Sequence, residues 1–233
     1  MTPAPLVRHV IYLHGFASSP GSSKAQRFKR ELEARNIGFS CPDFNEPAFE
    51  TLTTTRMLHH TIAAIDDVAS GPIALIGSSL GAFVAVLAVA QMRSGGVSNE
   101  SARDAAARKV DRLILLAPAL DFGGNRLRQF GEYGIDEWRR AGRIRMFHYA
   151  YNEPREIGFE LYEDAARYDA FDVSFDQPAL LFQGTRDDTV DPAMVERWSR
   201  SRANVELHLL DDDHQLTASM DVIWPACARF LGV

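Results

Sequence analysis

The sequence has little cysteine and no long hydrophobic run. Its 233 residues include two cysteines, Cys41 and Cys227, which lie far apart and in no metal-binding spacing, so we expect neither a disulfide framework nor a zinc site. The longest strongly apolar run, Leu80–Ala90, is too short for a membrane-spanning helix, which needs about 20 residues. The first ten residues lack the charged start and apolar core of a secretory signal. We therefore expect a cytoplasmic protein that makes no stable insertion into a membrane.

The sequence also lacks an excess of positive charge. Its formal net charge is -6, whereas a surface that binds nucleic acid needs a basic surplus, so we expect no nucleic-acid partner. Neither G-x-G-x-x-G after a strand nor G-x-x-x-x-G-K-[ST] occurs. The glycines therefore give no support for nucleotide binding.

Short apolar runs alternate with longer segments whose apolar residues recur at helical spacing. This alternation is typical of an α/β protein, in which helices cover both faces of a mostly parallel sheet. The six expected strands are Val7–Leu13, Ile37–Cys41, Ile73–Ile76, Val110–Ala117, Ala179–Phe182 and Val205–Leu210. The expected helices are 22–35, Leu52–Val68, Leu80–Met92, Pro192–Arg202 and Thr217–Leu231. Leu80–Met92 is apolar on all sides, so we place it at the centre of the molecule, and we expect Ser94–Lys109 to be a surface excursion.

One long segment, at about residues 121–176, interrupts this alternation. It contains 12 of the 23 aromatic residues but no clear strand, and a structureless loop of that length is rare in a compact domain. We interpret it as a small helical cap inserted in a single domain of residues 1–233. Its aromatic residues either line a binding pocket or form the core of the cap. Its arginines either meet an acidic group or form a solvated helix face. They are Arg126, Arg128, Arg139, Arg140, Arg143 and Arg145.

The run Gly77-Ser78-Ser79-Leu80-Gly81 joins an expected strand to the expected central helix. A G-x-S-x-G pattern at such a junction is typical of a nucleophile elbow, a turn so tight that the positions two before and two after the serine must be nearly free of side chain. The nucleophile is then Ser79 rather than Ser78. The helix that follows begins with free N–H groups, and that of Leu80 would donate to a developing oxyanion. The alternative interpretation is a plain glycine-rich turn.

A serine hydroxyl needs a base near neutral pH, and the base needs an acid that orients it. Of the seven histidines, only His14 and His214 lie in loops between a strand and the following helix. We predict that His214 is the base, and that His14 fixes its own loop by hydrogen bonding.

The orienting acid is predicted to follow another strand at the same edge of the sheet. Asp187 follows the strand Ala179–Phe182, which gives the chain order Ser, Asp, His that is found in hydrolases. Asp188, its neighbour, and Asp121, which follows a different strand, are alternatives.

The first expected strand ends in His14-Gly15-Phe16. Glycine at that point lets the backbone approach a ligand closely, so the N–H of Phe16 would be the second oxyanion donor beside that of Leu80. Each donor of this kind typically stabilises the transition state by about 2.7–4 kcal/mol.

Together these motifs resemble those of the α/β-hydrolase superfamily. His14-Gly15-Phe16, GSSLG at 77–81, GTRDDTV at 184–190 and His214 match its oxyanion, elbow, acid and base positions in order. The stretch LHGFASSPGSSKA at 13–25 is similar to small bacterial esterases of the YqiA type. DDVASGPIALIGSSLG and GTRDDTV resemble the mitochondrial hydrolase that removes palmitoyl groups from protein cysteines and cleaves acyl glucuronides. The superfamily often has proline after the position of Val190, whereas here Asp191 intervenes, which makes Asp191 a further candidate for the acid. The resemblance implies an α/β-hydrolase fold with a reduced sheet of about six strands.

The expected function is hydrolysis of a carboxylic ester or thioester through an acyl-enzyme, with a small-molecule acyl substrate. No metal or organic cofactor is expected, because the consecutive residues of Asp211–His214 cannot all turn toward one ion. One alternative keeps the fold and triad for C–C bond hydrolysis or a lyase reaction. Another is a catalytically silent binding protein with this fold.

Overall fold

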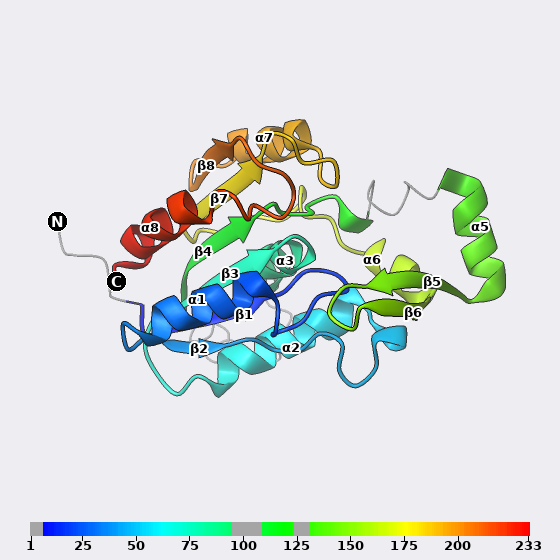
Figure 1. Ribbon diagram of the computed structural model, residues 1–233, viewed down its shortest axis with the longest axis horizontal. Helices are drawn as coiled ribbons and strands as arrows, with labels where there is room; N and C mark the ends of the chain where they lie inside the picture. The colour runs from blue at the N-terminus through cyan, green and yellow to red at the C-terminus, as the bar shows by residue number, and fades with distance from the viewer. Residues whose placement is uncertain (1–6, 95–108, 124–130) are drawn as a thin grey trace.

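The computed structural model describes residues 7–94, 109–123 and 131–233. Its main sheet has six strands, all parallel, in the order β2-β1-β3-β4-β7-β8 (Figure 1). The strands are β1 (His9–Leu13), β2 (Gly38–Ser40), β3 (Ile73–Ser78), β4 (Val110–Leu116), β7 (Ala179–Gly184) and β8 (Val205–Leu210). The helices that follow them are α1 (Ser23–Glu33), η1 (Phe49–Thr51), α2 (Thr54–Asp67), α3 (Leu80–Ser94), α7 (Pro192–Arg200) and α8 (Met220–Leu231). The predicted α/β architecture and all six predicted strands are confirmed.

Helices cover both faces of the main sheet. Successive residues of a strand point to opposite faces, so the apolar side chains on each face need helices to bury them. On one face α1 and α8 pack together, and the rings of Phe28 and Trp224 lie 5.8 Å apart. On the other face lie α2, α3 and α7. The side chains of α3 are buried from Leu80 to Ala90, which confirms the prediction of a central helix.

Local sequence explains where several helices begin. The side chain of Ser22 accepts from the N–H of Ala25 and begins α1, and Thr53 does the same for α2. Asp191 begins α7, with proline at the next position. Such side-chain oxygens satisfy N–H groups that the first turn of a helix leaves without a partner. These caps fix the loops that lead from the sheet into the helices.

The segment between β4 and β7 corrects one part of the sequence interpretation. It contains the expected helices, α5 (Gly131–Ala141) and α6 (Glu160–Ala165), but also an antiparallel hairpin of β5 (Arg143–His148) and β6 (Glu153–Gly158). The prediction of no clear strand there was wrong. In β5 the exposed Arg143, Arg145 and Phe147 alternate with more buried residues, which is the two-residue period of a strand. Residues 95–108 of the expected surface excursion, and Arg126 and Arg128, lie outside the described residues.

The hairpin lies beside the edge of the main sheet that is formed by the carboxyl ends of its strands. In Figure 1 the arrows of the parallel strands point toward the end of the molecule at which β5 and β6 lie. Ligands of open α/β sheets bind outside the carboxyl ends of the strands. The inserted segment therefore lies beside the edge at which a site is expected. Within the described ranges, no helix has the length and apolar character needed to cross a membrane.

Candidate active site

Ser79 occupies the tight turn between β3 and α3. Its φ is 54°, in the left-handed region that non-glycine residues rarely adopt. Glycine is required on both sides of it. A Cβ on Gly77 would lie 2.4 Å from Ala82 Cα, and one on Gly81 would lie 2.0 Å from the carbonyl oxygen of Leu13. The sequence Gly77–Gly81 therefore folds into the predicted elbow, and the strained backbone projects Ser79 from the turn.

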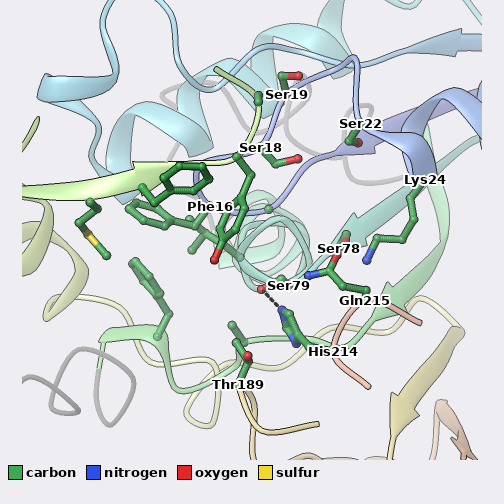
Figure 2. Close-up of a pocket in the computed structure, with 18 of the residues that line it drawn as sticks. Phe16, Ser18, Ser19, Ser22, Lys24, Ser78, Ser79, Thr189, His214 and Gln215 are labelled. Carbon is green, nitrogen blue, oxygen red and sulfur yellow. Dashed lines mark hydrogen bonds between the residues drawn. The ribbon is translucent and has the colours of Figure 1, made fainter. Parts of the chain in front are cut away.

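The structure brings Ser79, His214 and Asp187 together from three loops that are distant in sequence. The Nε2 atom of His214 lies 3.0 Å from Ser79 Oγ (Figure 2), and its Nδ1 atom lies 2.8 Å from Asp187 Oδ2. The side chain of His214 is 13% exposed and that of Asp187 is 0% exposed. A nucleophile, a base and an orienting acid require these two hydrogen bonds in this order.

The contacts of Asp187 fix which nitrogen of His214 carries the proton. An ionised carboxylate only accepts, so Nδ1 donates to Asp187 and Nε2 is left to accept from the hydroxyl of Ser79. Asp187 takes this position rather than Asp188, Asp191 or Asp121. Asp188 is exposed, and Asp191 caps α7.

Four donors surround the carboxylate of Asp187. Oδ1 accepts from the N–H groups of Thr189 and Val190, both at 2.8 Å. Oδ2 accepts from Gln183 Nε2 at 2.9 Å as well as from His214. Burial raises the pKa of Asp187, but the hydrogen bonds, with that of His214 first, outweigh burial and hold the pKa below 3.8. The acid is therefore ionised at neutral pH.

Gln183 is a site residue that the sequence analysis missed. It is fully buried in β7, where Nε2 holds Asp187, while Oε1 has no hydrogen-bond partner among the described residues. A polar residue at the end of the apolar strand sequence ALLFQG was the signal that could have identified it.

The two predicted oxyanion donors flank Ser79. Gly15 lies so close to the elbow that a Cβ on it would be 3.3 Å from the carbonyl oxygen of Ser78 and 3.4 Å from Ser79 Cβ. Phe16 follows it, and Phe16, Ser79 and Leu80 line one cavity. Within the part of the chain that the structure describes, the backbone N–H groups of Phe16 and Leu80 donate to no protein acceptor. Both are available to a ligand.

His14 fixes the loop that carries Phe16, as the sequence predicted. It is buried, with Nδ1 2.9 Å from the carbonyl oxygen of Gly15. Its Nε2 atom accepts from the N–H of Phe44 at 3.0 Å. An amide N–H only donates and a carbonyl oxygen only accepts, so Nε2 accepts from Phe44 and Nδ1 donates to Gly15. His14 is thus engaged on both sides and is not placed to act as a base.

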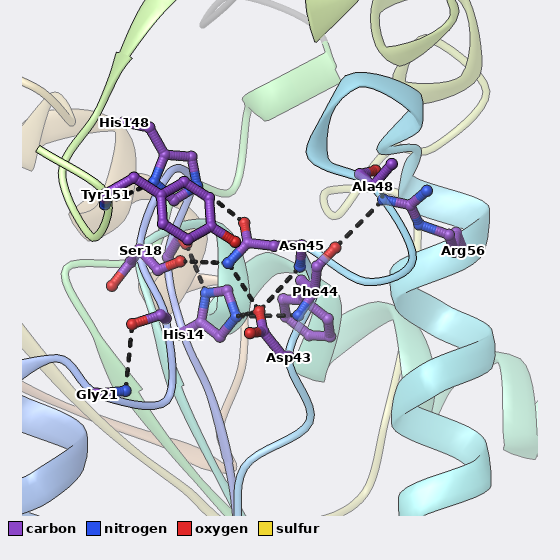
Figure 3. A network of polar contacts seen from close by, with 12 residues as sticks. His14, Ser18, Gly21, Asp43, Phe44, Asn45, Ala48, Arg56, His148 and Tyr151 are labelled. Atoms are coloured by element: carbon purple, nitrogen blue, oxygen red, sulfur yellow. Dashed lines mark hydrogen bonds and ion pairs between the residues drawn. The ribbon is translucent and has the colours of Figure 1, made fainter. Parts of the chain in front are cut away.

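A second histidine ties the hairpin to the same region (Figure 3). His148, at the end of β5, contacts Asn45 Oδ1 at 3.0 Å, and its Nδ1 accepts from the N–H of Tyr151. Asn45 Nδ2 in turn donates to the carbonyl oxygen of Ser18 at 2.8 Å and to Asp43 at 2.7 Å. The buried network therefore connects the inserted hairpin with the loop that follows β1.

A cavity of about 1090 Å³ lies above Ser79. The inserted segment supplies much of its wall, including Trp138, Arg145, Met146, Phe147, Tyr149 and Leu161. The aromatic residues of the segment both line the cavity and form the core of the segment. Trp138 lines the cavity and also packs against Phe159 and Tyr162. Arg145 lines the cavity, whereas Arg143 forms an ion pair at the surface.

Among residues 7–94, 109–123 and 131–233, no cluster of three or more His, Cys, Asp or Glu side chains is arranged to hold an ion.

Comparison with known proteins finds one family model and many similar structures. The model of an uncharacterised protein family, UPF0227, matches residues 9–94, which include the elbow and the loop of Phe16 but neither Asp187 nor His214. No curated protein matches the chain significantly.

Three examples from among the similar structures each match nearly the whole chain. A protein of Agrobacterium vitis S4 named as a hydrolase candidate is 22% identical, with a TM-score of 0.82 over 98% of this chain and 90% of its own. Alpha/beta hydrolase domain-containing protein 10 from mouse is 20% identical, with a TM-score of 0.74 over 100% and 90%. Est1E from Butyrivibrio proteoclasticus is 18% identical, with a TM-score of 0.74 over 99% and 88%. At these identities the likeness is one of fold.

Proposed function

The chain has the α/β-hydrolase fold, and we propose that it is a serine hydrolase that cleaves a carboxylic ester or thioester through an acyl-enzyme on Ser79. The observation that carries the proposal is the chain of hydrogen bonds from Ser79 Oγ through His214 to Asp187. The names of the similar proteins, which include a hydrolase domain protein and a monoacylglycerol lipase, support the same class of reaction.

The first half of the reaction forms the acyl-enzyme. Ser79 Oγ attacks the carbonyl carbon while His214 Nε2 takes its proton, and Asp187 stabilises the resulting imidazolium. The negative charge on the carbonyl oxygen is held by the N–H groups of Phe16 and Leu80. The C–O or C–S bond then breaks, and His214 gives its proton to the departing alcohol or thiol.

The second half regenerates the enzyme. His214 takes a proton from water, and the hydroxide attacks the acyl carbon. The tetrahedral intermediate collapses with release of the carboxylic acid, and the proton returns to Ser79 Oγ. The apolar wall formed by Phe122, Trp138 and Leu161 suits the acyl part of a substrate.

A fluorophosphonate probe tests the nucleophile. We expect stoichiometric labelling, detected as a mass increase of the intact protein and assigned to Ser79 by peptide mass spectrometry. Ser79→Ala abolishes the labelling, whereas Ser78→Ala, a change of the neighbouring serine, keeps it. Absence of labelling in the folded wild-type protein would support the silent binding protein instead.

A substrate panel tests the reaction. We expect turnover of p-nitrophenyl esters of some acyl length, or of an acyl thioester, that is lost in Ser79→Ala. Labelling of Ser79 without turnover of any ester or thioester would contradict the proposal and favour the C–C hydrolase or lyase alternative.

A further inference from the structure

One wall of the cavity carries a lysine that the proposed mechanism does not use. Lys24 lies in the first turn of α1, and it lines the same cavity as Ser79 and His214. Figure 2 shows its side chain extending toward the region of Ser78 and Gln215. Its ammonium group therefore points into the site and not into bulk solvent.

Lys24 differs from the other two lysines in having no hydrogen-bond or ion-pair partner among the described residues. Lys29, on the same helix, lies 3.9 Å from a carboxylate oxygen of Glu33, and Lys109 donates to the carbonyl oxygen of Ile65 at 2.8 Å. Among the described residues, none pairs with the ammonium group of Lys24 by a hydrogen bond or an ion pair. Burial of a cation that makes no hydrogen bond or ion pair costs free energy, and a ligand at the site would supply the missing contact.

The charge of Lys24 persists at neutral pH. Burial lowers the pKa of Lys24 to about 8, although Asp187, Asp213 and Asp212 attract the ammonium and oppose the change. The group is thus mostly protonated at pH 7, and it is less hydrated than a surface lysine. A desolvated cation binds an anion more strongly than an exposed one.

The position of Lys24 relative to His214 indicates which part of the substrate it meets. His214 must protonate the departing oxygen or sulfur, so the leaving group lies on the histidine side of Ser79. Gln215 follows His214 in the chain and lines the cavity, and in Figure 2 Lys24 lies on this side while Phe16 lies on the other. Lys24 is therefore placed beside the leaving group.

We infer that Lys24 binds a carboxylate on the alcohol or thiol part of the substrate and so determines its specificity. The inference rests on the proposed function of the site. The first turn of α1 supports it, because that turn contains no acidic residue that would oppose an anion. Arg145 also lines the cavity, but it is exposed, so solvent screens its charge.

A matched pair of esters tests this assignment. Meta-acetoxybenzoate and meta-acetoxybenzamide differ only in whether the leaving phenol carries a carboxylate or a neutral amide. We expect that Lys24→Met lowers the ratio of kcat/KM for the carboxylate to that for the amide by about 10–100-fold, the range for a lost hydrogen bond to a charged group. Lys24→Arg, which keeps the charge, restores part of the ratio. Intrinsic differences between the two phenols cancel, because each variant is compared with the wild type on the same pair.

Two control variants separate a local from a general charge effect. Lys29→Met removes the same charge from the same helix outside the cavity and leaves the ratio unchanged. Arg145→Met removes another cation that the described residues place in the cavity wall, and it lowers the ratio less than Lys24→Met does. A second pair of phenyl esters, with the carboxylate or amide on the acyl part, shows no dependence on Lys24.

The outcomes distinguish this inference from the proposed function. If the amide ester is hydrolysed by Ser79 but Lys24→Met leaves the ratio unchanged, the assignment of Lys24 is overturned and the hydrolase stands. The assignment of Lys24 is also overturned if Lys24→Met changes the ratio of kcat/KM only for the pair of esters that carries the carboxylate or amide on the acyl part. If neither ester is hydrolysed and the fluorophosphonate does not label Ser79, both proposals fail together. Because Lys24→Met removes an unpaired cation, we expect its melting temperature to be no lower than that of the wild type.

Discussion

Asp187 illustrates how single residues prepare the site before any substrate binds. Its carboxylate is held by two backbone N–H groups and by Gln183, so its orientation toward His214 is fixed from three further directions. A base whose proton lies on Nδ1 must present Nε2 to the hydroxyl of Ser79. Preorganisation of this kind avoids reorganisation during the reaction.

We expect Asp187→Asn to reduce kcat by about 10⁴-fold, because an amide nitrogen facing His214 favours the wrong tautomer of the ring. The control is Asp188→Asn, which changes the neighbouring exposed carboxylate in the same way. The measurement is kcat on the best ester of the panel, with a melting curve for each variant. Equal activity of the two variants would rule out the role assigned to Asp187.

The sequence identified the residues with distinctive chemistry but not those that support them. Ser79 and His214 could be predicted because the elbow motif and the strand-to-loop positions are local patterns. Gln183 lies in no motif, and Lys24 lies in the stretch 13–25 without a role that the pattern itself indicates, because the roles of both residues depend on which loops meet at the sheet edge. Asn45 meets His148 across 103 residues of sequence, a contact that no local pattern encodes.

At the scale of elements, the inserted hairpin and the loop after β1 behave as one unit. The N–H of Ala150 donates to the carbonyl oxygen of Ala17 at 3.3 Å, next to the link between His148 and Asn45. Aromatic packing adds to this link, since the ring of Phe49 contacts those of Phe16 and His148. A movement of the hairpin would therefore be transmitted to the backbone that offers the N–H of Phe16.

We expect Asn45→Ala to lower the free energy of unfolding by about 1–3 kcal/mol, because it removes the hydrogen-bond partner of the buried His148 Nε2 and one donor to the carbonyl oxygen of Ser18. We also expect kcat/KM to fall, because the loop of Phe16 is less firmly held. Urea unfolding measures the first effect, and hydrogen exchange at the amide of Ala150 reports the loosened hairpin. Unchanged exchange at that amide would show that the network does not couple the two elements.

The elements themselves were predictable to different degrees. The central strands β1, β3, β4 and β7 are buried apolar runs, and their positions follow from composition and periodicity. The edge strands β2 and β8 are only partly buried, and the turns beside them helped to locate them. The hairpin of β5 and β6 was missed because charged residues occupy its exposed positions and it packs against neighbouring elements instead of the main sheet. Its turn depends on Asn152 in the left-handed conformation, with a φ of 53°.

At the scale of the whole molecule, the pKa values of three histidines and three aspartates are shifted in the same direction, downward. Burial lowers the pKa of His9, His60 and His148. For Asp43 and Asp212, as for Asp187, burial raises the pKa, but hydrogen bonds outweigh burial and hold it below 3.8. In each case the native state binds fewer protons than the unfolded state over some range of pH.

We therefore expect the free energy of unfolding to fall in two stages as the pH is lowered. The first stage begins near pH 6.5, the ordinary value for histidine, because the three histidines gain protons more readily when unfolded. The second begins near pH 4, where the unfolded carboxylates take up protons and the folded ones do so only at lower pH. Urea unfolding at intervals from pH 8 to pH 3 measures both stages. Asp212→Asn makes the second stage shallower, and a curve that is flat below pH 5 would contradict the assignment.

The order in which the three central residues occur along the chain has a consequence for synthesis. Ser79 and Asp187 precede β8, whereas His214 lies in the loop beyond it. A chain that leaves the ribosome from its N-terminus can fold the elbow before the imidazole has been translated. Under the proposed mechanism the hydroxyl has no proton acceptor during that interval, so a partly synthesised chain would not react with acyl compounds.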